Sequence, residues 1–204
     1  MNASRYRGIY ALVDPAAHAE PLAYLDALLR GGIRIVQIRA KNGIVLPLLR
    51  ATVTAIRSAG GTAIVNDDVD LALEADGVHL GQEDLALHDL PALRARLGAR
   101  AIGLSCGTPA EARAVIPGSI DYLGAGPIFA TSSKSDAGGP IGVNGVRVVV
   151  EATTLPVTAI GGITVAAIPR VRRTGAAMAA VISALASASD PEAAARAFVA
   201  AWNA

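Results

Sequence analysis

Short polar clusters hold most of the side chains in this sequence that could do chemistry. Each cluster stands where a short apolar run ends. The clusters are Gln37-Ile-Arg39-Ala-Lys41, Asn66-Asp67, Gly81-Gln82-Glu83-Asp84, Ser105, Thr131-Ser132-Ser133-Lys134, Gly161-Gly162 and Ile182-Ser183. If the apolar runs are parallel strands, the clusters share one rim, where basic and acidic side chains can meet around an anion and its cation. This pattern is typical of an enzyme site for a phosphorylated substrate.

The first cluster places two cations on one side of a strand. Side chains alternate between the faces of a strand, so Gln37, Arg39 and Lys41 share one face. Two cations directed into a buried space are costly unless an anion meets them. The pattern therefore favours anion binding, although a solvated strand end or pairing with nearby acids would produce the same spacing.

Two aspartates follow neighbouring apolar runs. Asp67 ends the third run and Asp84 follows the fourth. Adjacent strands lie about 5 Å apart. The repulsion between two carboxylates at such a distance is relieved by a shared proton or by a hard cation. A Mg²⁺ ion bound by Asp67, Asp84 and the phosphate oxygens of a substrate would account for both the carboxylates and the nearby cations. Both residues could instead be turn or cap residues, and Glu83 could take the place of Asp84.

A second anion site is expected on the other side of the rim. Hydroxyls and an ammonium group in the loop Thr131-Ser132-Ser133-Lys134 suit a phosphate lid, or equally a Ser-rich surface loop. Gly161-Gly162 and Ser183 follow the seventh and eighth apolar runs, where barrels often bind phosphate on backbone N–H groups. Two anion sites in one mouth indicate two phosphorylated substrates.

The elements that must position these residues alternate between strand-like and helix-like segments. Among them we expect a strand over residues 33–41 and a helix over residues 69–75 that is capped by Asp68. Thr108 and Pro109 predict the cap and first turn of a helix that continues to residue 116. Eight such β-α units fit within 204 residues, which predicts an α/β protein with a single (β/α)₈ TIM-barrel domain over residues 1–204. A doubly wound open sheet is the alternative. That fold would need a phosphate loop after its first strand, and Val13-Asp14-Pro15 is no such loop.

Composition narrows the classes of function. The chain is 52% hydrophobic, 17% charged and 3% aromatic, which suits an aliphatic core of buried strands under helices. A net charge of +1 with no basic run gives no support to nucleic-acid binding or a membrane surface. The polar segment 1–7 lacks the apolar stretch of a signal peptide, and one cysteine suits a reducing compartment. We expect a cytoplasmic protein that acts on small molecules, with homo-oligomerisation left open.

Other reactive residues carry weaker signals. Cys106 lacks an obvious base neighbour, and His79 is expected to be a buried, hydrogen-bonded strand residue rather than a catalyst. His18 and His88 are expected at the surface. The spacing of these residues does not suit zinc, and neither a Gly-x-Gly-x-x-Gly nor a Walker sequence is present.

Several short motifs follow one another along nearly the whole chain. The run Ala75-Asp-Gly-Val-His-Leu-Gly-Gln-Glu-Asp84 is the most specific of them. The others are Gln37–Lys41, Asn66–Leu73, Gly103–Ser105, Asp121–Pro127, Thr131–Lys134, Ala159–Ile163 and Ile182-Ser183. Together and in this order, these segments resemble the thiamine-phosphate synthase family.

The resemblance implies a Mg²⁺-dependent transferase that joins a hydroxymethylpyrimidine diphosphate to a thiazole phosphate and releases diphosphate by dissociative substitution. It implies that Arg39, Lys41, Ser105 and Lys134 assist the reaction. The pyrimidine diphosphate would contact Gln37, Arg39, Lys41, Asn66, Ser105 and Lys134. The metal would be held by Asp67 and Asp84. The thiazole phosphate would contact Thr131, Ser132, Ser133, Gly162, Ile182 and Ser183.

The sequence departs from the family pattern at three places. Gly107 stands where the family often has a His or similar polar residue, Ser133 replaces the usual Thr, and Ala176-Ala177-Met178 replaces Ala-Asp-Gly. Two alternatives follow from the resemblance: a thiazole tautomerase-like relative and a non-catalytic protein that binds thiamine precursors. The complete set of Arg39, Lys41 and the two aspartates argues against both, and Pro127 argues against the tautomerase.

Overall fold

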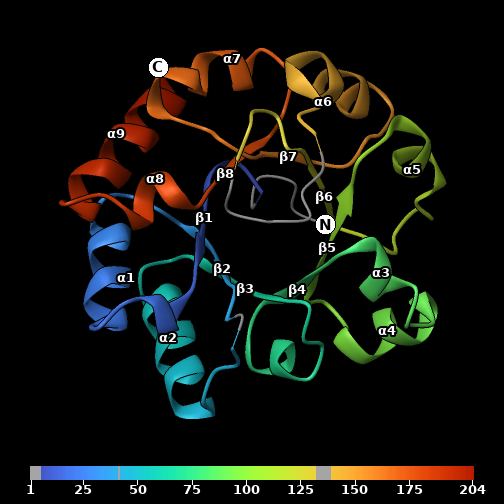
Figure 1. The fold of residues 1–204 in the computed structure, drawn as a ribbon. Helices are drawn as coiled ribbons and strands as arrows, with labels where there is room; N and C mark the ends of the chain where they lie inside the picture. The colour runs from blue at the N-terminus through green and yellow to red at the C-terminus, as the bar shows by residue number, and fades with distance from the viewer. Residues whose placement is uncertain (1–5, 41, 132–138) are drawn as a thin grey trace.

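Eight parallel strands close into one barrel, as the sequence predicts. The computed structural model describes residues 6–40, 42–131 and 139–204. The strands follow one another around the barrel in chain order, and β8 pairs with β1 to complete the ring (Figure 1). The strands are β1 Gly8–Val13, β2 Ile35–Ile38, β3 Thr62–Asn66, β4 Gly77–Leu80, β5 Ala101–Cys106, β6 Tyr122–Ala125, β7 Val157–Ile160 and β8 Met178–Val181.

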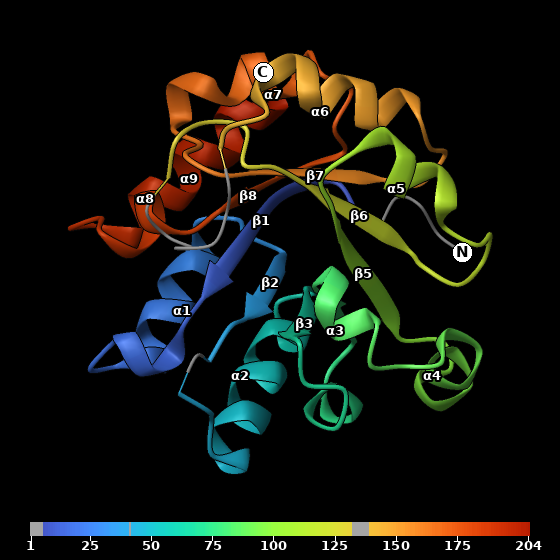
Figure 2. The same ribbon diagram turned by 45° about the vertical axis from the view of Figure 1, so that its right-hand side comes forward.

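Helices surround the barrel, as Figures 1 and 2 show. The α-helices are α1 Pro21–Arg30, α2 Leu46–Ser58, α3 Gln82–Leu85, α4 Leu90–Leu97, α5 Pro109–Ala114, α6 Gly142–Glu151, α7 Ile168–Arg172, α8 Ser183–Ala186 and α9 Pro191–Asn203. Single 3₁₀ turns are η2 Pro15–Ala17, η3 Leu71–Glu74 and η4 Val165–Ala167. Helix α9 packs beside α1, where an ion pair of 2.7 Å joins Arg30 to Glu192. The helical ring is thereby closed between the two ends of the chain.

Each strand divides its side chains between two cores. The aliphatic residues that face outward, such as Val36 and Val65, pack under the helices. The residues that face inward form a separate cluster with a larger aromatic share, which includes Tyr10, Tyr122 and Met178. This alternation follows from the period of two along a strand. Because both faces are covered, the strands read as nearly continuous apolar runs.

Local capping explains where several helices begin. The Thr108 hydroxyl accepts a hydrogen bond of 3.2 Å from the Glu111 N–H, and Pro109 follows it in the first turn, as predicted. Asp89 and Asp190 cap α4 and α9 in the same way, each by accepting a bond from the backbone N–H three residues on. These helices therefore start where the sequence signals place them.

The expected element bounds needed correction at several places. The strand expected over residues 33–41 covers Ile35–Ile38, and the helix expected over 69–75 is only the 3₁₀ turn Leu71–Glu74. Asp68 nevertheless caps that turn, because its carboxylate accepts a bond of 2.9 Å from the Leu71 N–H. The one-turn helices α3 and α8 were not expected, since four residues are too few to show a helical period.

The departure from the family pattern at Ala176-Ala177-Met178 lies far from the barrel mouth. Met178 begins β8, is fully buried, and packs in the inner cluster at the amino ends of the strands. The methionine side chain, which is larger than the glycine of the family pattern, therefore fills space inside the barrel at the amino ends of the strands. Within the described residues, no helix combines the length and apolar character that crossing a membrane requires.

Gly103 is the inner position where a side chain would disturb the fold most clearly. A Cβ there would lie 2.2 Å from Cζ of Tyr122 and 2.6 Å from Nδ1 of His79. We expect Gly103→Ala to lower the free energy of unfolding by about 1–3 kcal/mol, because the packed rings would have to move. Urea unfolding followed by circular dichroism measures the change. In the control Gly107→Ala, the new Cβ meets only a carboxylate oxygen at 3.8 Å, so equal losses in the two variants would contradict the packing argument.

Candidate active site at the C-terminal ends of the strands

Most of the described residues predicted for the diphosphate end of the site line one cavity at the mouth of the barrel. This cavity has a volume of about 130 Å³ and lies over the carboxyl ends of β1 to β5, β7 and β8. Its walls combine polar groups with three aliphatic side chains. They are Leu12, Gln37, Arg39, Asn66, Asp67, His79, Gly81, Asp84, Ser105, Ile160 and Ile182. A wider hollow of about 500 Å³ adjoins it along Arg39, Ala40 and Asn66 to Asp68.

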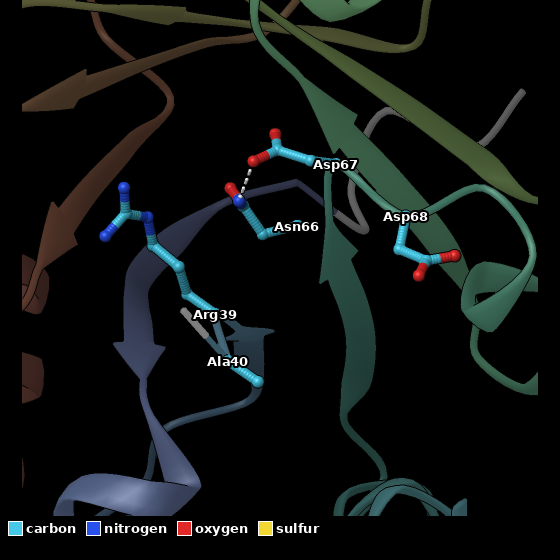
Figure 3. Close-up of a pocket in the computed structure, with 5 residues that line it drawn as sticks. All are labelled: Arg39, Ala40, Asn66, Asp67 and Asp68. Atoms are coloured by element: carbon cyan, nitrogen blue, oxygen red, sulfur yellow. Dashed lines mark hydrogen bonds between the residues drawn. The ribbon is translucent and has the colours of Figure 1, made fainter. Parts of the chain in front are cut away.

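The predicted alternation along β2 is present in the described residues. Gln37 is 2% exposed and points into the barrel, where its amide donates a bond of 3.0 Å to the Tyr10 hydroxyl. Arg39 follows the strand, and its backbone N–H is held by the carbonyl of Val13 at 2.8 Å. Its guanidinium extends toward the hollow that Asn66 and Asp67 also line (Figure 3). Lys41 lies outside the described residues.

Asp67 and Asp84 come together at the ends of β3 and β4. Asp67 has a φ of 62°, a left-handed conformation that is uncommon for a residue other than glycine. Its backbone N–H donates to the carbonyl of His79 at 2.9 Å, and its carboxylate accepts a bond from Asn66. Asp84 accepts a bond of 3.0 Å from the backbone N–H of Gly81, so it also serves as a cap. The cap alternative for Asp84 thus holds together with its place in the cavity wall.

The surroundings of Asp67 raise the pKa of its carboxyl group above the ordinary aspartate value. Loss of solvent is the largest cause, and the nearby Asp84 carboxylate adds to it. Arg39 and Asn66 act in the opposite direction without cancelling the effect. Two carboxylates that disfavour each other's charge are a suitable pair for a shared cation.

The neighbouring acids do not join this pair. Asp68 points away from Asp67 and caps the following turn (Figure 3). Glu83 is exposed and does not line the cavity, so the geometry favours Asp84 over Glu83. Within the described part of the chain, no group of three or more His, Cys, Asp or Glu could hold a metal. Asp67 and Asp84 would therefore need oxygen ligands from a substrate or from water.

Ser105 lies across the cavity from Gln37 and is held by two neighbours. Its hydroxyl bonds Nε2 of His79 at 3.2 Å, and its carbonyl accepts a bond of 2.6 Å from the amide of Gln82. His79 is a hydrogen-bonded strand residue, as predicted, but it also lines the cavity, a position that its sequence context does not indicate. Leu12 and Ile160 also line the cavity and were not predicted, since apolar strand residues carry no distinctive signal.

The expected thiazole-phosphate side is formed by the loops after β6, β7 and β8. Gly161 and Gly162 have φ values of 104° and 63°, and a Cβ on Gly162 would lie 2.4 Å from the carbonyl oxygen of Ala130. Glycine is thus required for the loops after β6 and β7 to pack together. Ile182 lines the cavity, and Ser183 begins α8 immediately after it. Thr131 ends a described stretch, whereas Ser132, Ser133 and Lys134 lie outside the described residues.

Cys106 is not a candidate nucleophile. It is 2% exposed and belongs to the core outside the barrel, and burial raises the pKa of its thiol to about 11. The thiolate, which is the reactive form, is therefore scarce at neutral pH.

Comparison with known sequences decides the family. A sequence profile described as thiamine monophosphate synthase matches residues 9–185. The chain belongs to this family. It is 44% identical over 200 residues to the thiamine-phosphate synthase of Herpetosiphon aurantiacus, covering 94% of this chain and 95% of that protein. It is also 47% identical over 198 residues to the bifunctional protein ThiM/ThiE of Symbiobacterium thermophilum, of which the match spans 40%.

Solved structures give the same family. The thiamine phosphate pyrophosphorylase from Pyrococcus furiosus superimposes with a TM-score of 0.87 at 31% identity, covering 99% of this chain and 98% of that one. More distant barrels, such as a 3-hexulose-6-phosphate synthase at 21% identity and a TM-score of 0.63, share the fold alone. The resemblance of the motifs to the thiamine monophosphate synthase family is thus confirmed, and with it the assignment of the chain as a transferase.

The raised pKa of Asp67 predicts that replacing its carboxyl group by a neutral one increases the stability of the folded protein, by an amount that depends on pH. Because the folded protein holds this proton more tightly than the unfolded chain, stability falls as pH rises from about 4 through the raised pKa. We expect Asp67→Asn, which tolerates the left-handed backbone, to be more stable than the wild type at pH 7 without divalent cations. The gain should shrink toward pH 4.

Thermal unfolding at low salt, at pH 4 and pH 7, measures this difference. Asp68→Asn removes the adjacent carboxylate that points away from the pair, so it controls for the loss of a charge alone. A gain for Asp67→Asn that is equal at both pH values, or a loss at pH 7, would contradict the electrostatic account.

Proposed function

We propose that this protein is a thiamine-phosphate synthase that transfers the hydroxymethylpyrimidine group from its diphosphate to a thiazole phosphate. One observation carries the proposal: a guanidinium, two paired carboxylates, two amides and a hydroxyl share a single cavity that also has aliphatic side chains in its walls. This combination suits a diphosphate with its cation beside a planar, weakly polar ring. Membership of the thiamine monophosphate synthase family supports the same activity.

In the proposed complex, the diphosphate lies along Arg39 and Asn66 in the open hollow. Guanidinium groups bind phosphate oxygens in a bidentate manner, and the Asn66 amide can donate beside it. The pyrimidine ring would enter the smaller cavity between Gln37 and Ser105. Lys41 and Lys134 complete the diphosphate contacts in this proposal, by resemblance to the family.

Asp67 and Asp84 would hold Mg²⁺. Hard carboxylate oxygens are suitable ligands, and one or two carboxylates with phosphates form the usual magnesium site. The raised pKa of Asp67 supports this assignment, since a cation between the carboxylates would relieve the repulsion that raises it. When bound, the metal would neutralise charge on the diphosphate.

The thiazole phosphate would occupy the other side of the mouth. Gly162, Ile182 and Ser183 follow β7 and β8, where backbone N–H groups of barrels bind phosphate. Thr131, Ser132 and Ser133 would supply hydroxyls to the same phosphate. In this proposal the thiazole ring would lie against Ile160 and Ile182, with its nitrogen toward the pyrimidine methylene group.

The residues fit a dissociative substitution. The bond between the pyrimidine methylene carbon and the diphosphate oxygen breaks, and its electron pair leaves with the diphosphate. Arg39 would stabilise the negative charge that grows on this leaving group. Leu12, Ile160 and Ile182 would keep water from the carbocation until the thiazole nitrogen supplies the electron pair of the new bond. This route requires no protein nucleophile, in agreement with the burial of Cys106.

A direct assay tests the proposal. The purified protein is incubated with both phosphorylated substrates, with and without Mg²⁺, and the products are separated by chromatography. Thiamine phosphate and diphosphate in equal amounts, formed only with Mg²⁺, are the expected result. Isomerisation of the thiazole phosphate without coupling would instead indicate a tautomerase, and binding without either product would indicate a carrier.

Asp84 offers the sharpest variant for the metal assignment. We expect Asp84→Asn to lower kcat/KM about 100-fold or more, because a charged ligand is lost while an amide oxygen can still accept the Gly81 N–H bond. The dependence of rate on Mg²⁺ concentration should also move to higher concentrations. Initial rates over a Mg²⁺ series measure both effects.

Glu83→Gln is the matched control for this variant. It makes the same change of charge one residue away, on an exposed side chain that does not line the cavity. Its kinetics should stay within about twofold of the wild type, since isolated surface changes have small effects. Equal losses in both variants, or an unchanged Asp84→Asn enzyme, would remove Asp84 from the metal site.

A further inference from the structure

A buried chain of hydrogen bonds runs beneath the cavity and joins Gln37 to Ser105. The Gln37 amide donates to the Tyr10 hydroxyl at 3.0 Å, and this hydroxyl bonds that of Tyr122 at 2.9 Å. The Tyr122 hydroxyl bonds Nδ1 of His79 at 3.1 Å, and Nε2 of His79 bonds the Ser105 hydroxyl at 3.2 Å. The chain thus crosses the barrel interior from β2 to β5 through β1, β6 and β4.

The barrel is built to accommodate this chain. A Cβ on Gly103 would lie 2.4 Å from the Tyr122 hydroxyl, and one on Gly124 would lie 3.1 Å from the His79 ring. Both strands carry glycine where the rings need space. Tyr122 also stacks on Tyr6, with ring centroids 5.3 Å apart. Since side chains in such packing have few alternative rotamers, the bonded atoms are held in place.

Proton counting gives the chain a direction. Burial keeps both tyrosines protonated by raising the pKa of each, so each hydroxyl has one hydrogen to donate. Because Tyr10 accepts from Gln37, its own hydrogen finds an acceptor only in Tyr122, among the hydrogen bonds of the described residues. Tyr122 then donates to Nδ1 of His79, whose proton must lie on Nε2 and be donated to Ser105. With the Gln37 amide donating to Tyr10, the reverse order would leave the hydrogen of the Tyr10 hydroxyl without an acceptor among the hydrogen bonds of the described residues, which is costly.

We propose that Tyr10, Tyr122 and His79 are positioning residues that fix the hydrogen-bonding polarity of the pyrimidine site. The inference rests on the proposed function, which puts the pyrimidine ring between Gln37 and Ser105. In the directed chain, Gln37 presents its carbonyl oxygen as an acceptor, and Ser105 presents its hydroxyl hydrogen as a donor. An aminopyrimidine matches this pair, because its amino group donates and the adjacent ring nitrogen accepts. An oxopyrimidine with a protonated ring nitrogen presents the opposite polarity and would be rejected.

The first experiment examines the protein without substrate. Nitrogen-15 NMR of the uniformly labelled wild-type chain reports the tautomer of each of its three histidines, and a His79→Gln variant identifies the signals of His79. We expect the proton of His79 on Nε2, with Nδ1 unprotonated. A proton on Nδ1 would overturn the directed chain whatever the enzyme does. Because no turnover is needed, this result is independent of the proposed function.

The second experiment measures kinetics of Tyr122→Phe, which removes the hydroxyl and keeps the ring. We expect the KM for the pyrimidine diphosphate to rise about tenfold, with the KM for the thiazole phosphate unchanged. Discrimination against an oxopyrimidine diphosphate analogue should fall by a similar factor. Equal increases in both KM values, or unchanged discrimination, would overturn the proposal. If this variant does not fold, the tautomer of His79 in the wild-type protein decides whether the directed chain is correct.

Two further variants separate a connected chain from general damage to the barrel interior. Tyr10→Phe should produce the same kinetic pattern, and the double variant should be no worse than the poorer single variant, since all three break one chain. Losses that add would overturn the proposal. Thr158→Val is the matched control: it removes a buried hydroxyl that has no hydrogen-bond partner among the described residues, and we expect wild-type kinetics.

Discussion

Closure of the parallel sheet is the constraint on which the candidate site depends. Eight short strands pair in one direction around the ring, so every carboxyl end opens onto the same mouth. Residues as distant in sequence as Leu12 and Ile182 thereby line one cavity. The outer helices fill the space around the sheet, and α9 closes the ring against α1. The stability of the barrel comes largely from aliphatic side chains buried between the outer faces of the strands and the helices. The inner positions of the strands are therefore available for polar groups.

The inner positions show how polar groups are accommodated without water. Gln37, Tyr10 and Tyr122 are almost fully buried, and each is hydrogen-bonded to the next. An unpaired buried amide or hydroxyl costs about 1–3 kcal/mol, so a complete chain is far more stable than a broken one. Gly103 and Gly124 provide the space that the rings require. A layer of fixed polar groups therefore lies directly below the mouth, where it can orient the side chains that face a ligand.

The mouth itself holds charges that are unfavourable in the isolated protein. Asp67 and Asp84 repel one another, and Asp67 also adopts a left-handed backbone conformation. Such local strain persists where the surrounding structure imposes it, and it is frequent at functional sites. Arg39 reduces the repulsion only in part. In the proposed complex, a bound cation and a diphosphate would neutralise both sets of charges together.

The sequence by itself determined the α/β alternation, the barrel and the polar rim, because apolar periodicity, helix caps and terminal glycines are local signals. Pro109 after Thr108 predicted the start of α5, and Gln37 with Arg39 predicted a shared face. The sequence did not predict the short helices α3 and α8, because four residues are too few to show a helical period. Only the tertiary structure decided that Asp84 rather than Glu83 faces Asp67, and that Tyr10, Tyr122 and His79 connect Gln37 to Ser105. Contacts between side chains on different strands depend on register and on the space that glycines leave, and neither is encoded in the spacing along one strand.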